Sequence, residues 1–156
     1  MKNTNYTEVE VSKELMSYIT FLKAGKLDEI INDVIRLSYE YKLPAMKQLE
    51  GVRPETIYYL TSIGINDFFN DILAEKPIEG LLRALDDWTN KRIGEEISTL
   101  THNDIVTGYL IRKQVLIKKI PEYNTDPIIY INLVQELNNL IAQIEATALR
   151  ALAIVI

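Results

Sequence analysis

Cysteine is absent from this chain of 156 residues, and histidine occurs once, as His102. The lack of cysteine excludes disulfides, thiol catalysis and cysteine-type zinc sites. A di-iron site built on two Glu-x-x-His motifs is excluded because it needs a second histidine. The sequence also lacks a glycine-rich phosphate loop and a nucleophile elbow. We therefore expect no enzyme, no catalytic residue and no metal site.

Basic clusters and long apolar runs are missing as well. The chain has 17 basic and 22 acidic residues, and its basic side chains occur at most in pairs such as Lys118-Lys119. Because phosphate neutralisation supplies most nucleic-acid affinity, this pattern predicts no nucleic-acid partner. No run approaches the ~18 apolar residues of a membrane-spanning helix, and the N-terminus is not signal-like. We expect a cytoplasmic protein with no membrane partner.

The residues that are present are typical of one helical domain over 1–156. Apolar residues make up 47% of the chain and charged residues 25%, as in globular proteins. Apolar spacings of three and four residues recur almost throughout, between short turns that contain proline or glycine. Thr7 is the predicted cap of the first helix, Pro54 and Pro77 are expected to begin later helices, and Gly64 marks a close approach or a break. The sequence predicts an all-α fold of six to eight helices with a long C-terminal helix.

His102 follows Thr101, and Thr101 has the spacing of a capping box with Asp104. This places His102 at the exposed first position of a helix, and we expect no cofactor. A lone histidine in an all-α domain also suggests a haem ligand, so haem is the alternative cofactor. A Soret band that disappears in the His102→Ala variant would establish that alternative.

Tyrosine is unusually frequent, with nine residues against three phenylalanines. A buried ring with its hydroxyl in water explains each one singly, but a cavity between helices would accept a small apolar or amphipathic ligand. The candidate lining residues are Tyr39, Tyr41, Tyr58, Tyr59 and Tyr109. Arg112 lies two helical turns after Asp104, where an ion pair elsewhere or a snorkelling side chain is favoured and anion binding is an alternative.

The last region, residues 126–156, contains no glycine and only one proline, Pro127. Its apolar residues recur at alternating steps of three and four, which predicts a helix of roughly 30 residues, or ~45 Å, with an a/d heptad seam. We expect this seam to be the interface of a homodimer. The seam residues are Val134, Leu137, Ile141, Ile144, Ala148, Ala151 and Val155.

A second heptad position, occupied by Leu133, Leu140 and Ile154, widens this apolar stripe. The breadth predicts burial on two sides, one against the domain and one against a symmetry mate. The alternative is the core helix of a monomeric bundle, which would explain burial only to about Ile144 and leave residues 151–156 as an exposed patch. Because the stripe continues to the last residue, we expect a partner helix or a following domain.

The order and spacing of residues 66–150 resemble a known family of helical domains. The residues that carry the resemblance are the run 100–105, Tyr109, Arg112-Lys113, Leu116 and the run 123–126 before the long helix. They resemble the later half of sensory domains at the N-termini of bacterial histidine kinases, and the non-haem globin-like domains of stressosome RsbR proteins. The resemblance implies a globin-like bundle that dimerises and continues through its last helix into an output domain. It implies no catalytic residue and no haem ligand.

Together these features predict a non-catalytic cytoplasmic sensory or regulatory domain. It would homodimerise and relay a signal through 126–156 to an output domain such as a histidine kinase. The chain itself contains no phosphoacceptor or ATP-binding segment. The alternatives are a haem-binding globin-type gas sensor and a helical adaptor that docks another protein.

Overall fold

The computed structural model describes the backbone of residues 6–91 and 101–155, and the side chains of residues 6–87, 101 and 103–152. The described backbone forms seven α-helices and one 3₁₀ helix and contains no strand. This confirms the predicted all-α fold with its long last helix. The elements are α1 (Lys13–Gly25), α2 (Leu27–Glu40), η1 (Pro44–Leu49), α3 (Pro54–Leu73), α4 (Pro77–Lys91), α5 (His102–Lys118), α6 (Ile120–Tyr123) and α7 (Pro127–Val155).

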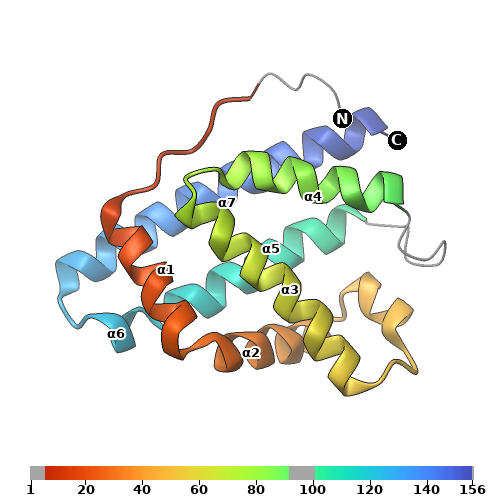
Figure 1. Cartoon of the computed structure of the whole chain (residues 1–156), viewed down its shortest axis with the longest axis horizontal. Helices are drawn as coiled ribbons and strands as arrows, with labels where there is room; N and C mark the ends of the chain where they lie inside the picture. Colours follow the sequence, from red (N-terminus) through yellow and green to blue (C-terminus); the bar gives the residue numbers. More distant parts are fainter. Residues whose placement is uncertain (1–5, 92–100, 156) are drawn as a thin grey trace.

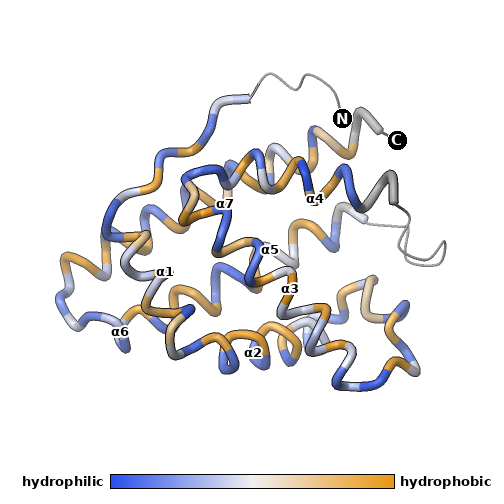
Figure 2. The backbone as a smooth tube through the Cα atoms, viewed as in Figure 1, coloured by the Kyte–Doolittle hydropathy of each residue, from blue (hydrophilic) through white to orange (hydrophobic). Residues whose placement is uncertain are grey.

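The helices pack in two layers around one apolar core. In Figure 1, α5 and α7 lie side by side at the back, while α3 and α4 pass in front of them. Helix α2 packs on α3 and α5, and α1 packs on α2 and α3. Figure 2 shows hydrophobic and hydrophilic residues alternating along α2 and α7, as expected for helices with one buried side.

Local signals set most helix boundaries. Pro54, Pro77 and Pro127 are the first residues of α3, α4 and α7, where the missing N–H of proline costs no hydrogen bond. At the start of α5, the Thr101 hydroxyl accepts from the Asp104 N–H at 3.1 Å, and Asp104 Oδ2 accepts from the Thr101 N–H at 3.0 Å. The predicted capping box is therefore confirmed.

Thr7 does not cap the first helix, and that prediction is wrong. Residues 7–12 are not helical, and α1 begins at Lys13, where the Ser12 hydroxyl accepts from the Leu15 N–H at 3.0 Å. Val9 and Val11 are both buried, because side chains two residues apart in an extended segment point the same way. We call residues 7–12 the N-terminal strap; it runs alongside α7 in Figure 1.

Gly64 lies inside an unbroken α3, so of its two predicted roles the helix break is wrong. A Cβ atom built at Gly64 would lie 3.7 Å from Nη2 of Arg112. The glycine therefore marks the place where α3 comes close to the Arg112 side chain of α5.

The heptad seam of α7 faces the core of its own chain. The buried seam residues, each at most 3% exposed, are Leu137, Ile141, Ile144, Ala148 and Ala151. Val134 is half-buried, and the side chain of Val155 lies outside the described residues. Leu133 and Leu140, from the second heptad position, are buried in the same core.

Burial of α7 within the chain also continues further than expected. Leu152 is only 5% exposed, so the expectation that intramolecular burial ends near Ile144 is wrong. The reason is that α4 packs along α7 beside α5 and covers it. Among the described side chains of α7, the large exposed aliphatic ones lie at its other end, where Ile128 is 68% and Ile131 52% exposed.

Candidate functional site: a cleft around Arg112

Two adjoining hollows lie between α3, α4, α5 and α7, and we call them together the Arg112 cleft. The larger hollow has a volume of about 220 Å³ and the smaller one of about 130 Å³. Both are bordered by Leu81, Ala84, Tyr109 and Arg112. The larger is completed by Leu85, Asp104, Ile105, Gly108 and Ala148, and the smaller by Gly64, Asp67, Phe68, Asp71, Pro77, Gly80 and Ile144.

Small residues create the space. Gly108 of α5, Ala84 of α4 and Ala148 of α7 each place little or no side chain at the larger hollow. A Cβ atom built at Gly108 would have no neighbouring atom within 4 Å. Because protein interiors are otherwise close-packed, three small residues facing one another from three helices leave a hollow that a ligand can enter.

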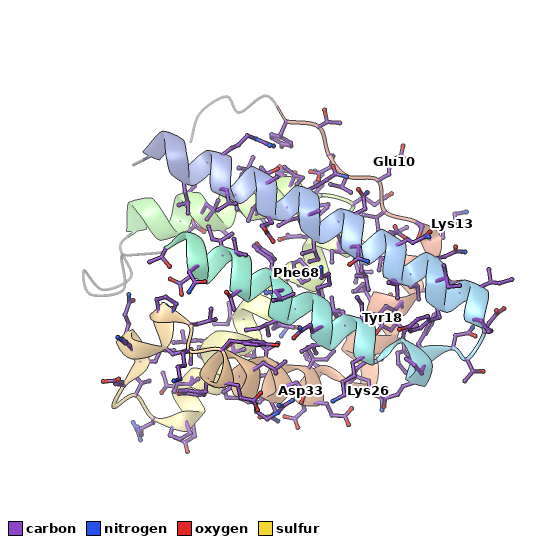
Figure 3. The ribbon with its side chains drawn as sticks, turned by 180° about the vertical axis from the view of Figure 1, so that it is seen from behind. Glu10, Lys13, Tyr18, Lys26, Asp33 and Phe68 are labelled. Atoms are coloured by element: carbon purple, nitrogen blue, oxygen red, sulfur yellow. The ribbon has the colours of Figure 1, made fainter. Side chains whose placement is uncertain are left out.

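The guanidinium group of Arg112 lies over two aromatic rings. Its Cζ atom is 4.9 Å from the ring centroid of Phe68 on α3 and 5.2 Å from that of Tyr109 on α5. These cation–π contacts fix the planar group without using its N–H donors. Among the described residues, no carboxylate pairs with Arg112 and no group accepts a hydrogen bond from it. Figure 3 shows Phe68 close to α5 when the molecule is seen from behind.

Two of the carboxylates that line the cleft are already engaged. Asp71 Oδ1 accepts from Nη2 of Arg83 at 2.9 Å. Asp104 is buried and accepts from the Thr101 N–H and hydroxyl and, through Oδ1, from the Ala45 N–H at 2.9 Å. The third, Asp67, is exposed to water. Arg112 is therefore the charged group of the cleft whose N–H donors have no acceptor among the described residues.

Burial changes the acid–base behaviour of two groups beside Arg112. Loss of water raises the pKa of the Asp71 carboxyl, and the Arg83 guanidinium offsets part of that rise. Loss of water also raises the pKa of the Tyr109 phenol, while Arg112 acts in the opposite direction. Tyr109 therefore stays neutral at physiological pH and contributes a ring face and a hydroxyl, not a charge.

The five candidate tyrosines lie in different places. Tyr109 borders the Arg112 cleft, whereas Tyr39 and Tyr58 border a separate hollow of about 580 Å³ between α2 and α3. The Tyr58 hydroxyl donates to Asp28 Oδ1 at 2.6 Å, and the Tyr41 hydroxyl donates to Gln114 Oε1 at 3.1 Å. Tyr59 is 62% exposed. Tyr41 is 44% exposed, so neither Tyr41 nor Tyr59 has a buried ring, whereas Tyr58 packs on the core with its hydroxyl at Asp28.

The sequence carries a local signal for the contact between Arg112 and Tyr109. Tyr109 and Arg112 are three residues apart, so they are neighbours on one face of α5. Phe68, Gly108 and Ala148 carry no such local signal, since tertiary packing alone brings them to the cleft.

The structure does not test the haem alternative. His102 is the first residue of α5, as predicted, but its side chain lies outside the described residues. Within the described part of the chain, no group of three histidine, aspartate or glutamate side chains is arranged to bind a metal ion. Nor does any described helix combine the length and apolarity needed to cross a membrane.

Fold and cleft together define an all-helical protein with a small, mainly apolar site between helices and one arginine inside it. Comparison with protein-family models, curated proteins and solved structures found no match to this chain. The resemblance to globin-like sensory domains therefore stays a prediction, and the cleft and the helices that line it are the features that bear on function.

Proposed function

We propose that this chain is a non-catalytic regulatory domain of globin-like helical arrangement that binds a small ligand in the Arg112 cleft and relays the binding through α7 to an output partner. The observation that carries the proposal is that Ala148 and Ile144 of α7 line the two hollows of the cleft. A ligand in the cleft would therefore contact the longest helix of the molecule directly.

Relay requires two packings of α7 with different affinity for the ligand. The cleft supplies a physical basis for two such packings, because a ligand larger than the existing hollow favours a state in which α4 and α7 lie further apart. Packed helices respond to such a wedge by shifting as units rather than by yielding locally. An output partner that contacts α7, such as a kinase domain, would detect the shift.

Homodimerisation is part of the proposal, but on a face other than the heptad seam. Five seam residues are buried within the chain, and turning them outward would open the core. Ile128 and Ile131 are exposed at neighbouring positions on the outer face of α7. This face also supports the alternative function, a helical adaptor that docks a different protein.

Ligand binding is tested by titrating the ¹⁵N-labelled chain with three compounds that share one skeleton: 3-phenylpropionate, 3-phenylpropanol and 3-phenylpropylamine. We expect saturable amide shifts from at least one compound, beginning around Gly108 and extending along α7 from Ala148. The Gly108→Leu variant fills the larger hollow and should abolish these shifts. The Gly108→Ala variant, which adds only a methyl group at the same position, is the matched control and should bind.

Two results would contradict the proposal. If none of the three compounds causes saturable shifts in the wild-type chain, or if Gly108→Leu binds as well as Gly108→Ala, the cleft is not a ligand site. If the shifts stay within α4 and α5 and do not reach α7, ligand binding is retained and the relay through α7 is wrong.

A further inference from the structure

We infer that the Arg112 cleft selects an organic anion, meaning a ligand with one carboxylate or similar oxyanion on a compact apolar body. This inference rests on the proposed function, since it takes the cleft to be the ligand site. It adds the chemical class of the ligand and assigns Arg112 as the residue that recognises its charge.

Arg112 presents an oriented guanidinium group to the cleft. Phe68 and Tyr109 orient the guanidinium plane through their ring faces, and no described carboxylate neutralises its charge. A guanidinium offers parallel N–H donors that match the two oxygens of a carboxylate. The side chain is half-buried, so an ion pair formed here would be less weakened by water than one on the open surface.

The carboxylates of the cleft, which would favour a cation instead, are either engaged or exposed. Asp71 already accepts from Arg83, and Asp104 already accepts from the Thr101 and Ala45 N–H groups. Asp67 is exposed, so water screens its charge. An amine in the cleft would lie next to the unpaired charge of Arg112 without a free buried carboxylate to compensate.

The lining and the volume of the larger hollow determine which kind of ligand body fits. Leu81, Leu85, Ile105 and Ala148 give the larger hollow an apolar lining, which favours hydrocarbon over polar groups. Its volume of about 220 Å³ is below the ~300–1,000 Å³ of sites that take drug-sized molecules. The cleft therefore fits a short chain or a single ring better than a nucleotide or a polycyclic cofactor.

The test compares the affinities of the three phenylpropyl compounds, which share one skeleton and differ in a terminal group that is an anion, a neutral hydroxyl or a cation. For the wild-type chain at neutral pH and low salt, we expect 3-phenylpropionate to bind about ten-fold or more tightly than 3-phenylpropanol. The amine should bind least well. This ratio is measured on the unmodified protein, so it does not depend on how any variant folds.

Variants then assign the preference to Arg112. Arg112→Met keeps an apolar stem but removes the charge, and should lower the affinity for 3-phenylpropionate to that for 3-phenylpropanol. Arg112→Lys keeps the charge without the planar fork, and should bind the anion more weakly than wild type while still preferring it. Lys113→Met removes one positive charge from the next position of α5 and should leave all three affinities unchanged.

The results separate this inference from the function on which it rests. Equal affinity for the anion and the alcohol, or a preference for the amine, would overturn the inference while ligand binding in the cleft stands. An anion preference that persists in Arg112→Met would overturn the role of Arg112. Failure of all three compounds to bind would overturn the proposed function and the inference together.

Discussion

At the scale of single residues, Gly80 lies where α4 passes very close to the carboxyl group of Asp71. A Cβ atom built at Gly80 would lie 2.0 Å from Oδ2 and 2.2 Å from Cγ of Asp71. Gly80→Ala therefore has to displace the carboxyl group and break its ion pair with Arg83. We expect a net loss of about 1 kcal/mol or more in unfolding free energy, because overpacking typically costs more than alanine adds in helix propensity.

Urea denaturation followed by circular dichroism measures this loss, and Gly108→Ala is the control. Its Cβ would meet nothing within 4 Å, so the same substitution on α5 should stabilise the chain. If both variants unfold at the same urea concentration, the close approach at Gly80 is not a constraint.

The raised pKa of Asp71 makes the unfolding free energy depend on pH. Burial raises its pKa above 3.8 in the folded chain, so the folded state binds this proton more tightly than the unfolded state does. The resulting stability is present below the unfolded pKa and is lost as the pH rises through the folded pKa. Asp71→Asn removes this step.

We therefore expect the unfolding free energy of Asp71→Asn, relative to wild type, to increase as the pH rises from about 3.8 through that window. Urea denaturation at a series of pH values gives the difference. Glu10 of the N-terminal strap is exposed and is not among the charges that act on Asp71, so Glu10→Gln supplies the control variant. A difference that falls as the pH rises would mean that the pairing with Arg83 outweighs burial.

At the scale of elements, Glu8 fastens the N-terminal strap to α4. Its carboxylate accepts from the Ile78 N–H at 2.8 Å and from the Glu79 N–H at 3.1 Å. These are the first free donors of α4, where a negative charge is also favoured by the helix dipole. Glu8→Ala should lower the unfolding free energy by ~1–2 kcal/mol, as loss of a helix cap does.

The matched control for this prediction is Glu10→Ala, two residues away in the same strap, where the side chain is exposed. Thermal unfolding of both variants gives the comparison, and we expect little change for Glu10→Ala. Hydrogen exchange at Ile78 and Glu79 adds a local measurement that should accelerate only in Glu8→Ala. Equal stability of the two variants would show that the strap does not depend on Glu8.

The same element explains what the sequence could and could not predict. Pro54, Pro77 and the Thr101–Asp104 pair are local signals, and the helices begin where these residues predict. The strap was missed because Glu8 has its partners 70 residues further along the chain. The cleft was missed for the same reason, since Phe68, Gly108 and Ala148 come from three different helices and meet only after packing.

At the scale of the whole molecule, α7 shows why a heptad pattern does not identify its partner. The spacing of its apolar residues is the same for a dimer seam and for a helix buried in a bundle. Here α4 and α5 both pack on α7, and Leu137 and Leu140 are both buried within one chain. The pattern predicts that the helix is covered, and the other helices of the chain determine what covers it.

Two lysine variants of α7 distinguish the core from an interface. Ile141 is 2% exposed and belongs to the central core, so Ile141→Lys should unfold the chain or destabilise it by several kcal/mol, on the order of the cost of a buried unpaired charge. Ile131 is 52% exposed, so Ile131→Lys should retain the fold. If the proposed homodimer uses the outer face of α7, Ile131→Lys should also convert it to a monomer.

Circular dichroism and sedimentation equilibrium at tens of micromolar measure both properties on the same samples. A folded, monomeric Ile141→Lys beside a dimeric Ile131→Lys would show that the heptad seam is the interface and that the chain rearranges to expose it. A monomeric wild-type chain would contradict homodimerisation. Because Ile128 and Ile131 would then still be exposed in that monomer, the outer face of α7 would be left to a different protein, as the adaptor alternative requires.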